Sequence, residues 1–138
     1  MIAPAQSLVI VGSGLAAWTL VREFRKLDAQ TPITLITRDN GDFYSKPMLS
    51  NALSSGKTAA QLVSTTSAAM AEQHGVKLMA HTEVMAIDPV ACTISTSQGT
   101  VAYSRLVLAL GADAVRLPLQ GDAADRVLSV NDLQDYAA

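Results

Sequence analysis

The chain has 138 residues, of which 49% are hydrophobic and 16% are charged, and its formal net charge is −2. This length suits one globular domain of ordinary size, and the composition excludes a disordered chain. The small net charge, the lack of a Lys/Arg cluster and the lack of an apolar run of roughly 18 residues argue against nucleic acid, an anionic membrane surface and a membrane span.

Residues 7–11 are predicted to form a buried first strand, and a glycine turn follows it. Residues 15–27 then carry apolar side chains at helical spacing, with charged side chains on the opposite face. Between them stands Gly12-Ser13-Gly14-Leu15-Ala16-Ala17, a pattern typical of dinucleotide-binding sites. The first glycine allows a tight turn, the second lets the backbone approach a pyrophosphate, and the small third residue lets helix and strand pack closely. A purely structural strand-turn-helix can carry the same short motif, so both interpretations stay open here.

The second strand is predicted over residues 33–37, and it completes a βαβ unit. In an NAD-binding unit of this kind, a carboxylate at the end of the second strand holds the ribose hydroxyls. Thr37 stands at that position, and Arg38 and Asp39 follow it. We consider Asp39 a candidate ribose ligand and Arg38 a candidate for adenosine or phosphate. The alternative for both is a solvated loop charge.

A long polar segment, residues 38–64, should contain short helices or carry function, because long connections are rare in compact domains. Within it, Lys46 and Pro47 lie near the first turn if the loop folds back over the carboxyl edge of the sheet. Lys46 could neutralise a pyrophosphate, and the rigid backbone at Pro47 could lie against a flat ring.

The second half of the chain changes from helical spacing to short strands. Turn signals at Pro89 and Gln98-Gly99 predict an antiparallel meander. The fold class is therefore α/β, with a Rossmann-like βαβ parallel sheet and an inserted antiparallel β-meander. The predicted elements are a helix over 66–74 ended by Gly75, strands over 76–79, 83–88, 92–96, 100–103 and 106–110, and a short last helix with Asn131 as its N-cap.

Three further residues have reactive side chains. The single cysteine, Cys92, is expected to pack as a small hydrophobe in a strand, which suits a reducing, cytoplasmic setting. His74 and His81 have no carboxylate or cysteine at ligand spacing, so we interpret both as ordinary polar positions. Hydrolase and ATP-binding glycine motifs are absent from the sequence. We therefore predict no catalytic residue and no metal ligand in this chain.

Taken in order, these stretches resemble the N-terminal part of the two-dinucleotide-fold flavoprotein reductases, and among them the bacterial rubredoxin reductases. The most specific stretches are Arg22-Glu23-Phe24-Arg25-Lys26-Leu27 and Lys46-Pro47-Met48-Leu49-Ser50, and the similarity extends over essentially all 138 residues. The resemblance implies FAD as the cofactor, NADH as a co-substrate whose site lies outside this chain, and rubredoxin as the electron acceptor. This sequence lacks the redox cysteine pair of the related disulfide reductases, so the resemblance implies that electrons would leave the flavin without a thiol relay.

The resemblance also implies a role for individual residues. The turn of Gly12, Gly14, Leu15, Ala16 and Ala17 would lie under the FAD pyrophosphate. Thr37 stands where many relatives have a ribose carboxylate, which leaves Arg38 and Asp39 as the candidates at this position. Lys46 would approach the flavin or the diphosphate, and Pro47 would lie beside the isoalloxazine. The main chain at Val84 would meet adenine, and Ala109 to Ala112, with Gly111 among them, would form a second FAD contact segment.

Two departures from the family pattern bear on the expected activity. Asn51 stands where ferredoxin reductases often place a lysine, which favours the rubredoxin branch. A second glycine motif, a return segment and an interface domain are missing. We therefore expect 1–112 to be the first segment of an incomplete FAD-binding domain, and 113–138 to be a connection toward an absent NADH-binding domain. We expect such a fragment to be inactive alone, with an exposed sheet edge that favours self-association. The alternatives are a ferredoxin reductase or NADH oxidase of the same family, and a non-catalytic nucleotide-binding module.

Overall fold

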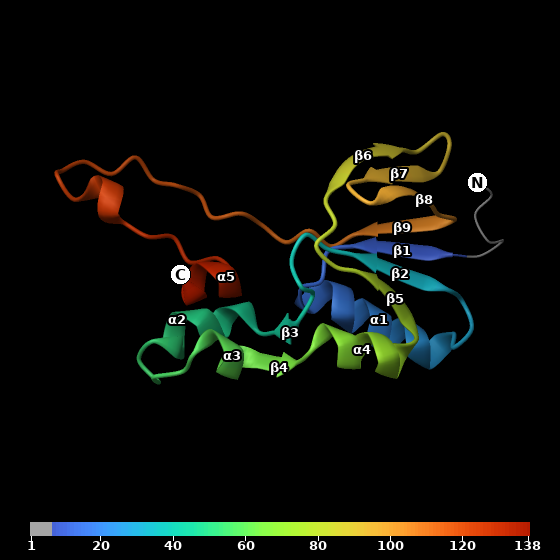
Figure 1. Ribbon diagram of the computed structural model, residues 1–138, viewed down its shortest axis with the longest axis horizontal. Helices are drawn as coiled ribbons and strands as arrows, with labels where there is room; N and C mark the ends of the chain where they lie inside the picture. Colours follow the sequence, from blue (N-terminus) through green and yellow to red (C-terminus); the bar gives the residue numbers. More distant parts are fainter. Residues whose placement is uncertain (1–6) are drawn as a thin grey trace. The chain divides into compact units, whose positions relative to one another are not determined.

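A computed structural model describes residues 7–138, which form two compact units (Figure 1). The first, called the sheet unit below, contains the described residues up to Phe43 together with Thr65–Gly111. The second, called the helical unit, contains Tyr44–Ser64 and Ala112–Ala138. The assignment of 1–112 to a cofactor domain and of 113–138 to a connection stays a prediction.

A four-stranded parallel sheet forms the centre of the sheet unit. Its strand order is β5-β2-β1-β9, and every neighbouring pair is parallel. The strands are β1 (Leu8–Val11), β2 (Ile33–Ile36), β5 (Val76–Met79) and β9 (Arg105–Leu108). The predicted parallel sheet is therefore confirmed, and each strand begins and ends within two residues of its predicted bounds.

Two helices cover one face of this sheet, α1 (Leu15–Leu27) and α4 (Ser67–His74) (Figure 1). Their apolar side chains pack against alternate residues of β1 and β2; the buried cluster is Leu8, Ile10, Ala17, Trp18, Val21, Ile33, Leu35, Met70 and Val76. Burial of each large side chain stabilises the fold by roughly 1.5–3 kcal/mol. Gly75 ends α4 in the left-handed conformation at φ 57°, as the sequence predicts.

The antiparallel meander covers the other face of the sheet. It consists of β6 (Val84–Asp88), β7 (Thr93–Thr96) and β8 (Gly99–Ala102), and both strand pairs are antiparallel. The cluster between the layers is Val9, Val11, Ile36, Ile94 and Tyr103. Since the helices bury one set of β1 side chains and the meander buries the other, β1 is apolar at every position. The predicted meander is confirmed.

One sequence prediction in this region is wrong. Cys92 does not pack in a strand: it is exposed, it lies in the turn before β7, and its φ is +53°. The reason is a tight turn in which the Asp88 carboxylate accepts hydrogen bonds from the main-chain N–H groups of Val90 and Ala91, at 2.9 and 2.8 Å. His81 lies in the turn between the predicted strands, with φ +49°.

The helical unit consists of short elements, as expected for the long polar segment. Its helices are η1 (Lys46–Met48), α2 (Leu49–Ala52), α3 (Ala59–Leu62), η2 (Ala124–Arg126) and α5 (Leu133–Ala137). Leu49, Ala52 and Leu62 form its small core, with Tyr44, Leu133 and Tyr136 packed against them. The Tyr136 hydroxyl also donates a 2.6 Å hydrogen bond to the Lys57 carbonyl. A two-stranded sheet of β3 (Phe43–Tyr44) and β4 (Val63–Thr65) adjoins this segment.

The last helix begins one residue later than the sequence indicates. Asp132, and not Asn131, is the N-cap of α5: its carboxylate accepts hydrogen bonds from the N–H groups of Gln134 and Asp135, both at 2.9 Å. Asp135 in turn accepts a bond from the Asp132 N–H, which completes a capping box. Asn131 therefore lies outside the helix, and its side chain bonds to the Ala112 carbonyl instead.

Candidate cofactor-binding site

The turn between β1 and α1 packs against the end of β9. Gly12 has a φ of +112°, and a Cβ at this position would lie 2.1 Å from the carbonyl oxygen of Ala109. Hydrogen bonds hold the same place: the Gly12 N–H donates to the Ile36 carbonyl and the Ala109 N–H to the Val11 carbonyl, both at 2.8 Å. Only glycine suits both the conformation and the close approach, and Gly12 and Ala109 lie together at the carboxyl edge of the sheet.

Gly14 faces open space instead. Its φ is −72°, an ordinary value, and a Cβ added to it would meet none of the described atoms within 4 Å. Gly14 is the N-cap of α1, no side chain of the described residues caps this helix end, and the following Leu15 and Ala16 are exposed. The first N–H groups of a helix lack intrahelical partners and carry the positive end of its dipole. The open surface at Gly14 therefore suits an anion such as a pyrophosphate.

Ala17 is the third small residue of the motif, and it is fully buried. It belongs to the cluster that joins α1 to β1 and β2. A larger side chain would separate helix and sheet, which is the packing reason for a small residue at this position.

The residues after β2 turn inward toward the glycine turn. Oδ1 of Asp39 accepts hydrogen bonds from the hydroxyls of Thr37, at 2.6 Å, and Ser13, at 3.0 Å, and the two hydroxyl oxygens are 2.9 Å apart. Ser13 and Thr37 are buried, whereas Arg38 between the strand end and Asp39 is exposed. The structure thus brings Thr37 and Asp39 to the glycine turn. The contact of Ser13 with these two residues has no signal in the sequence.

The remaining predicted contact residues of the sheet unit lie at strand ends. Val84 begins β6, where the pairing register with β7 shifts between Val84 and Ala86, and its side chain packs on the meander's core. Gly111 is exposed and has a φ of +71°. Their roles toward a cofactor stay predictions.

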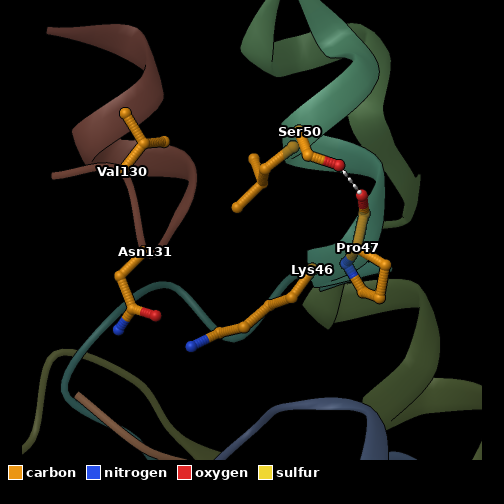
Figure 2. A pocket seen from close by; sticks show the side chains of 6 residues that line it. Lys46, Pro47, Ser50, Val130 and Asn131 are labelled. Atoms are coloured by element: carbon orange, nitrogen blue, oxygen red, sulfur yellow. Dashed lines mark hydrogen bonds between the residues drawn. The ribbon is translucent and has the colours of Figure 1, made fainter. Parts of the chain in front are cut away.

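In the helical unit, Lys46 and Pro47 line a cavity of about 350 Å³ together with Leu49, Ser50, Val130 and Asn131 (Figure 2). Figure 2 shows the Lys46 side chain extending toward that of Asn131. Ser50 Oγ donates a 2.8 Å hydrogen bond to the Pro47 carbonyl, and the Asn131 side chain donates one of 3.0 Å to the Ala112 carbonyl. A cavity of this size, with one cation and few polar groups, is within the range of small-molecule sites.

Val130 and Asn131 are lining residues that the sequence does not assign to a site. They are more than 80 residues from Lys46 in the chain, and no short motif connects the two segments. The expected position of Lys46 near the glycine turn stays a prediction.

Other classes of site find no support in the part of the chain that the structure describes. No group of three or more His, Cys, Asp or Glu side chains within residues 7–138 is placed to hold a metal ion. Over the same residues, no helix has both the length and the apolar character that crossing a membrane requires.

A parallel sheet with a glycine turn and an open helix end at its carboxyl edge is the arrangement typical of nucleotide-binding α/β proteins. The chain belongs to the pyridine nucleotide-disulphide oxidoreductase family, whose family model matches residues 6–138. This is a family of FAD-dependent NAD(P)H oxidoreductases.

Two relatives show which reductases of this family the chain is similar to. The chain is 50% identical over 129 residues to the rubredoxin-NAD(+) reductase of Alcanivorax borkumensis, a match that covers 94% of this chain and 34% of the relative. It is 45% identical over 134 residues to the nitric oxide reductase FlRd-NAD(+) reductase of Aeromonas hydrophila, covering 97% of this chain and 34% of that protein. The chain therefore spans about a third of the length of these relatives, and the resemblance to rubredoxin reductases is confirmed.

Solved structures agree with the fold. Putidaredoxin reductase in its covalent complex with putidaredoxin matches with a TM-score of 0.76 and 28% identity, over 95% of this chain and 33% of that chain. The NADH:rubredoxin oxidoreductase from Clostridium acetobutylicum shares the fold with a TM-score of 0.73 at 21% identity, over 94% of this chain and 33% of that chain.

Proposed function

We propose that this chain is the FAD-binding part of an NADH:rubredoxin oxidoreductase. The observation that carries the proposal is the open surface at Gly14. The N-terminal end of α1 has no side-chain cap there, and a Cβ on Gly14 would meet none of the described atoms within 4 Å. Similarity to the reductases of Alcanivorax and Aeromonas supports the choice of cofactor and of reaction. Gly12, Gly14, Leu15, Ala16 and Ala17 would together hold the pyrophosphate.

The other predicted site residues complete this proposal. Arg38 would reach adenosine or phosphate, the main chain of Val84 would meet adenine, and Ala109 and Gly111 would form the second contact segment. The cavity residues Lys46 and Pro47 would lie at the flavin end, where Lys46 supplies a positive charge and Pro47 a rigid apolar surface. Bound FAD would supply the hydride and one-electron chemistry, and the chain would bind and orient it.

In the complete reaction, electrons would pass from NADH through FAD to rubredoxin. We place the NADH site and most of the acceptor surface outside these 138 residues, because the matched relatives are about three times as long. Cys92 is the single cysteine of the sequence and is exposed in a turn, so these residues offer no thiol pair as a relay.

The test uses the protein that carries this chain, purified from its own gene. It should contain flavin, bleach when NADH is added without oxygen, and then reduce rubredoxin. A protein without flavin would overturn the proposal. Rubredoxin, a [2Fe–2S] ferredoxin and oxygen are compared as acceptors at equal concentration. Faster turnover with ferredoxin or oxygen identifies the ferredoxin reductase or NADH oxidase alternative, and flavin that NADH does not reduce identifies a non-catalytic module.

A further inference from the structure

One oxygen of the Asp39 carboxylate is engaged by three donors within the chain. Its Oδ1 accepts three hydrogen bonds: from Thr37 Oγ1 at 2.6 Å, from Ser13 Oγ at 3.0 Å and from the Gly41 N–H at 2.9 Å. An ionised carboxylate only accepts hydrogen bonds, and each hydroxyl has one hydrogen to donate. Asp39 is therefore the acceptor that lets both hydroxyls donate at once. Without it, the two could satisfy only one hydrogen bond between themselves.

The Ser13 hydroxyl connects this carboxylate to the glycine turn, because Ser13 stands between Gly12 and Gly14. The turn is also held by the bond from the Gly12 N–H to the Ile36 carbonyl. The loop that carries Asp39 is itself fixed, since the buried Trp18 indole donates a 3.0 Å hydrogen bond to the Gly41 carbonyl. The Asp39 carboxylate is thus held in place by its own loop and contacts the turn at Ser13.

Resting on the proposed FAD site, we infer that Asp39 is a positioning residue, which holds the turn in its pyrophosphate-binding shape through Ser13, and is not a ligand of the adenosine ribose. Its Oδ1 is engaged by the turn and by the loop that carries Asp39, whereas a carboxylate at the end of a second strand normally accepts hydrogen bonds from the ribose hydroxyls. Hydrogen bonds to a charged group are stronger than those between neutral groups, so their loss should be measurable in ligand affinity.

Binding measurements on variants test the connection. In the protein that carries this chain, Asp39→Ala should weaken FAD binding about tenfold, the equivalent of one such hydrogen bond. Ser13→Ala should weaken it similarly, and the double variant should be no weaker than either single one, because both remove the same link. Asp39→Asn keeps an acceptor oxygen and should recover most of the affinity. The matched control is Asp42→Ala, which removes a carboxylate of the same loop that bonds to the Ser67 N–H and not to the turn.

Probes that differ in their ribose distinguish a positioning role of Asp39 from a role as ribose ligand. ADP and 2′,3′-dideoxy-ADP are used as probes that share the pyrophosphate and differ in the ribose hydroxyls. If Asp39 positions the turn, Asp39→Ala weakens both probes by the same factor. If instead Asp39→Ala weakens ADP alone and leaves the dideoxy probe unchanged, Asp39 binds ribose and the inference is overturned.

A measurement without ligand distinguishes failure of this inference from failure of the proposed function. Amide hydrogen exchange of Gly12, whose N–H donates to the Ile36 carbonyl, should be about tenfold faster in Asp39→Ala than in the unaltered protein, and unchanged in Asp42→Ala. Equal exchange in all three proteins overturns the positioning role, whatever the FAD result. Faster exchange in a protein that binds no FAD overturns the proposed function instead, and with it the part of the inference that concerns pyrophosphate.

Discussion

Gly12 lies so close to the main chain of Ala109 that a Cβ on Gly12 would stand 2.1 Å from the Ala109 carbonyl oxygen. The two residues are far apart in the sequence but follow neighbouring strands, β1 and β9, whose carboxyl ends meet at one edge of the sheet. This approach places the glycine turn directly on the end of the last parallel strand. Gly12 is therefore required for packing, whereas Gly14 faces open space, and substitutions at the two positions should have different effects.

Gly12→Ala should destabilise the fold. The added methyl group meets backbone atoms that have no side-chain freedom to yield, and a φ of +112° is strained for alanine. We expect the free energy of unfolding to fall by at least about 2 kcal/mol, measured by urea denaturation. An unfolding free energy equal to that of the unaltered protein would show that the turn does not pack on Ala109 as described.

Gly14→Ala is the matched substitution with the opposite expectation. Its Cβ meets no described atom and its φ of −72° suits alanine, so stability should change by less than about 1 kcal/mol. FAD affinity should fall at least about tenfold, because the methyl group enters the space in which the pyrophosphate approaches the backbone. Flavin titration of the folded variant measures this, and unchanged affinity would remove Gly14 from the site.

Arg25 is a structural residue at the other end of α1. Its guanidinium donates to the carbonyls of His74, Thr31, Gly75 and Asp28 at 2.7 to 3.2 Å, and so it joins the ends of two helices to the loop before β2. Arg25→Lys keeps the charge but not the planar fork, and should cost about 1.5–3 kcal/mol of unfolding free energy with FAD affinity unchanged. Arg22→Lys, at an exposed position of the same helix, should change stability by less than about 0.5 kcal/mol. Equal effects of the two substitutions would contradict the assignment.

Asp28 should make the sheet unit sensitive to acid. Hydrogen bonds from the Thr31 hydroxyl, the Thr31 N–H and the Gln30 N–H lower the pKa of Asp28 to about 2. A lowered pKa stabilises the folded state fully above the unfolded value of about 3.9, and this contribution is lost as the pH falls through about 2. The melting temperature of Asp28→Asn should therefore lie below that of the unaltered protein at pH 5, and the gap should narrow toward pH 2. A gap that does not depend on pH would contradict the lowered pKa.

The local elements could be predicted from the sequence because their signals are local. The apolar run and glycine motif define β1, the turn and α1, and the turn residues Pro89 and Gly99 define the meander. Cys92 is one exception: the turn that begins at Asp88 extends through Cys92, and β7 therefore starts one residue later than hydrophobic character indicates.

The site could be predicted only in part, because it depends on contacts between distant residues. The Asp39 carboxylate accepts a hydrogen bond from the hydroxyl of Ser13, 26 residues earlier in the chain. Asn131 enters the Lys46 cavity because Asp132 takes the cap of α5. Neither relationship has a periodicity or spacing that a single sequence can express.

The flavin content of the protein that carries this chain, purified from its own gene and compared with its Gly14→Ala variant, is the most direct measurement. We expect one FAD per unaltered chain, and a folded variant that loses flavin on dialysis. An unaltered protein without flavin, or a Gly14→Ala variant that retains it fully, would contradict a FAD site at this turn.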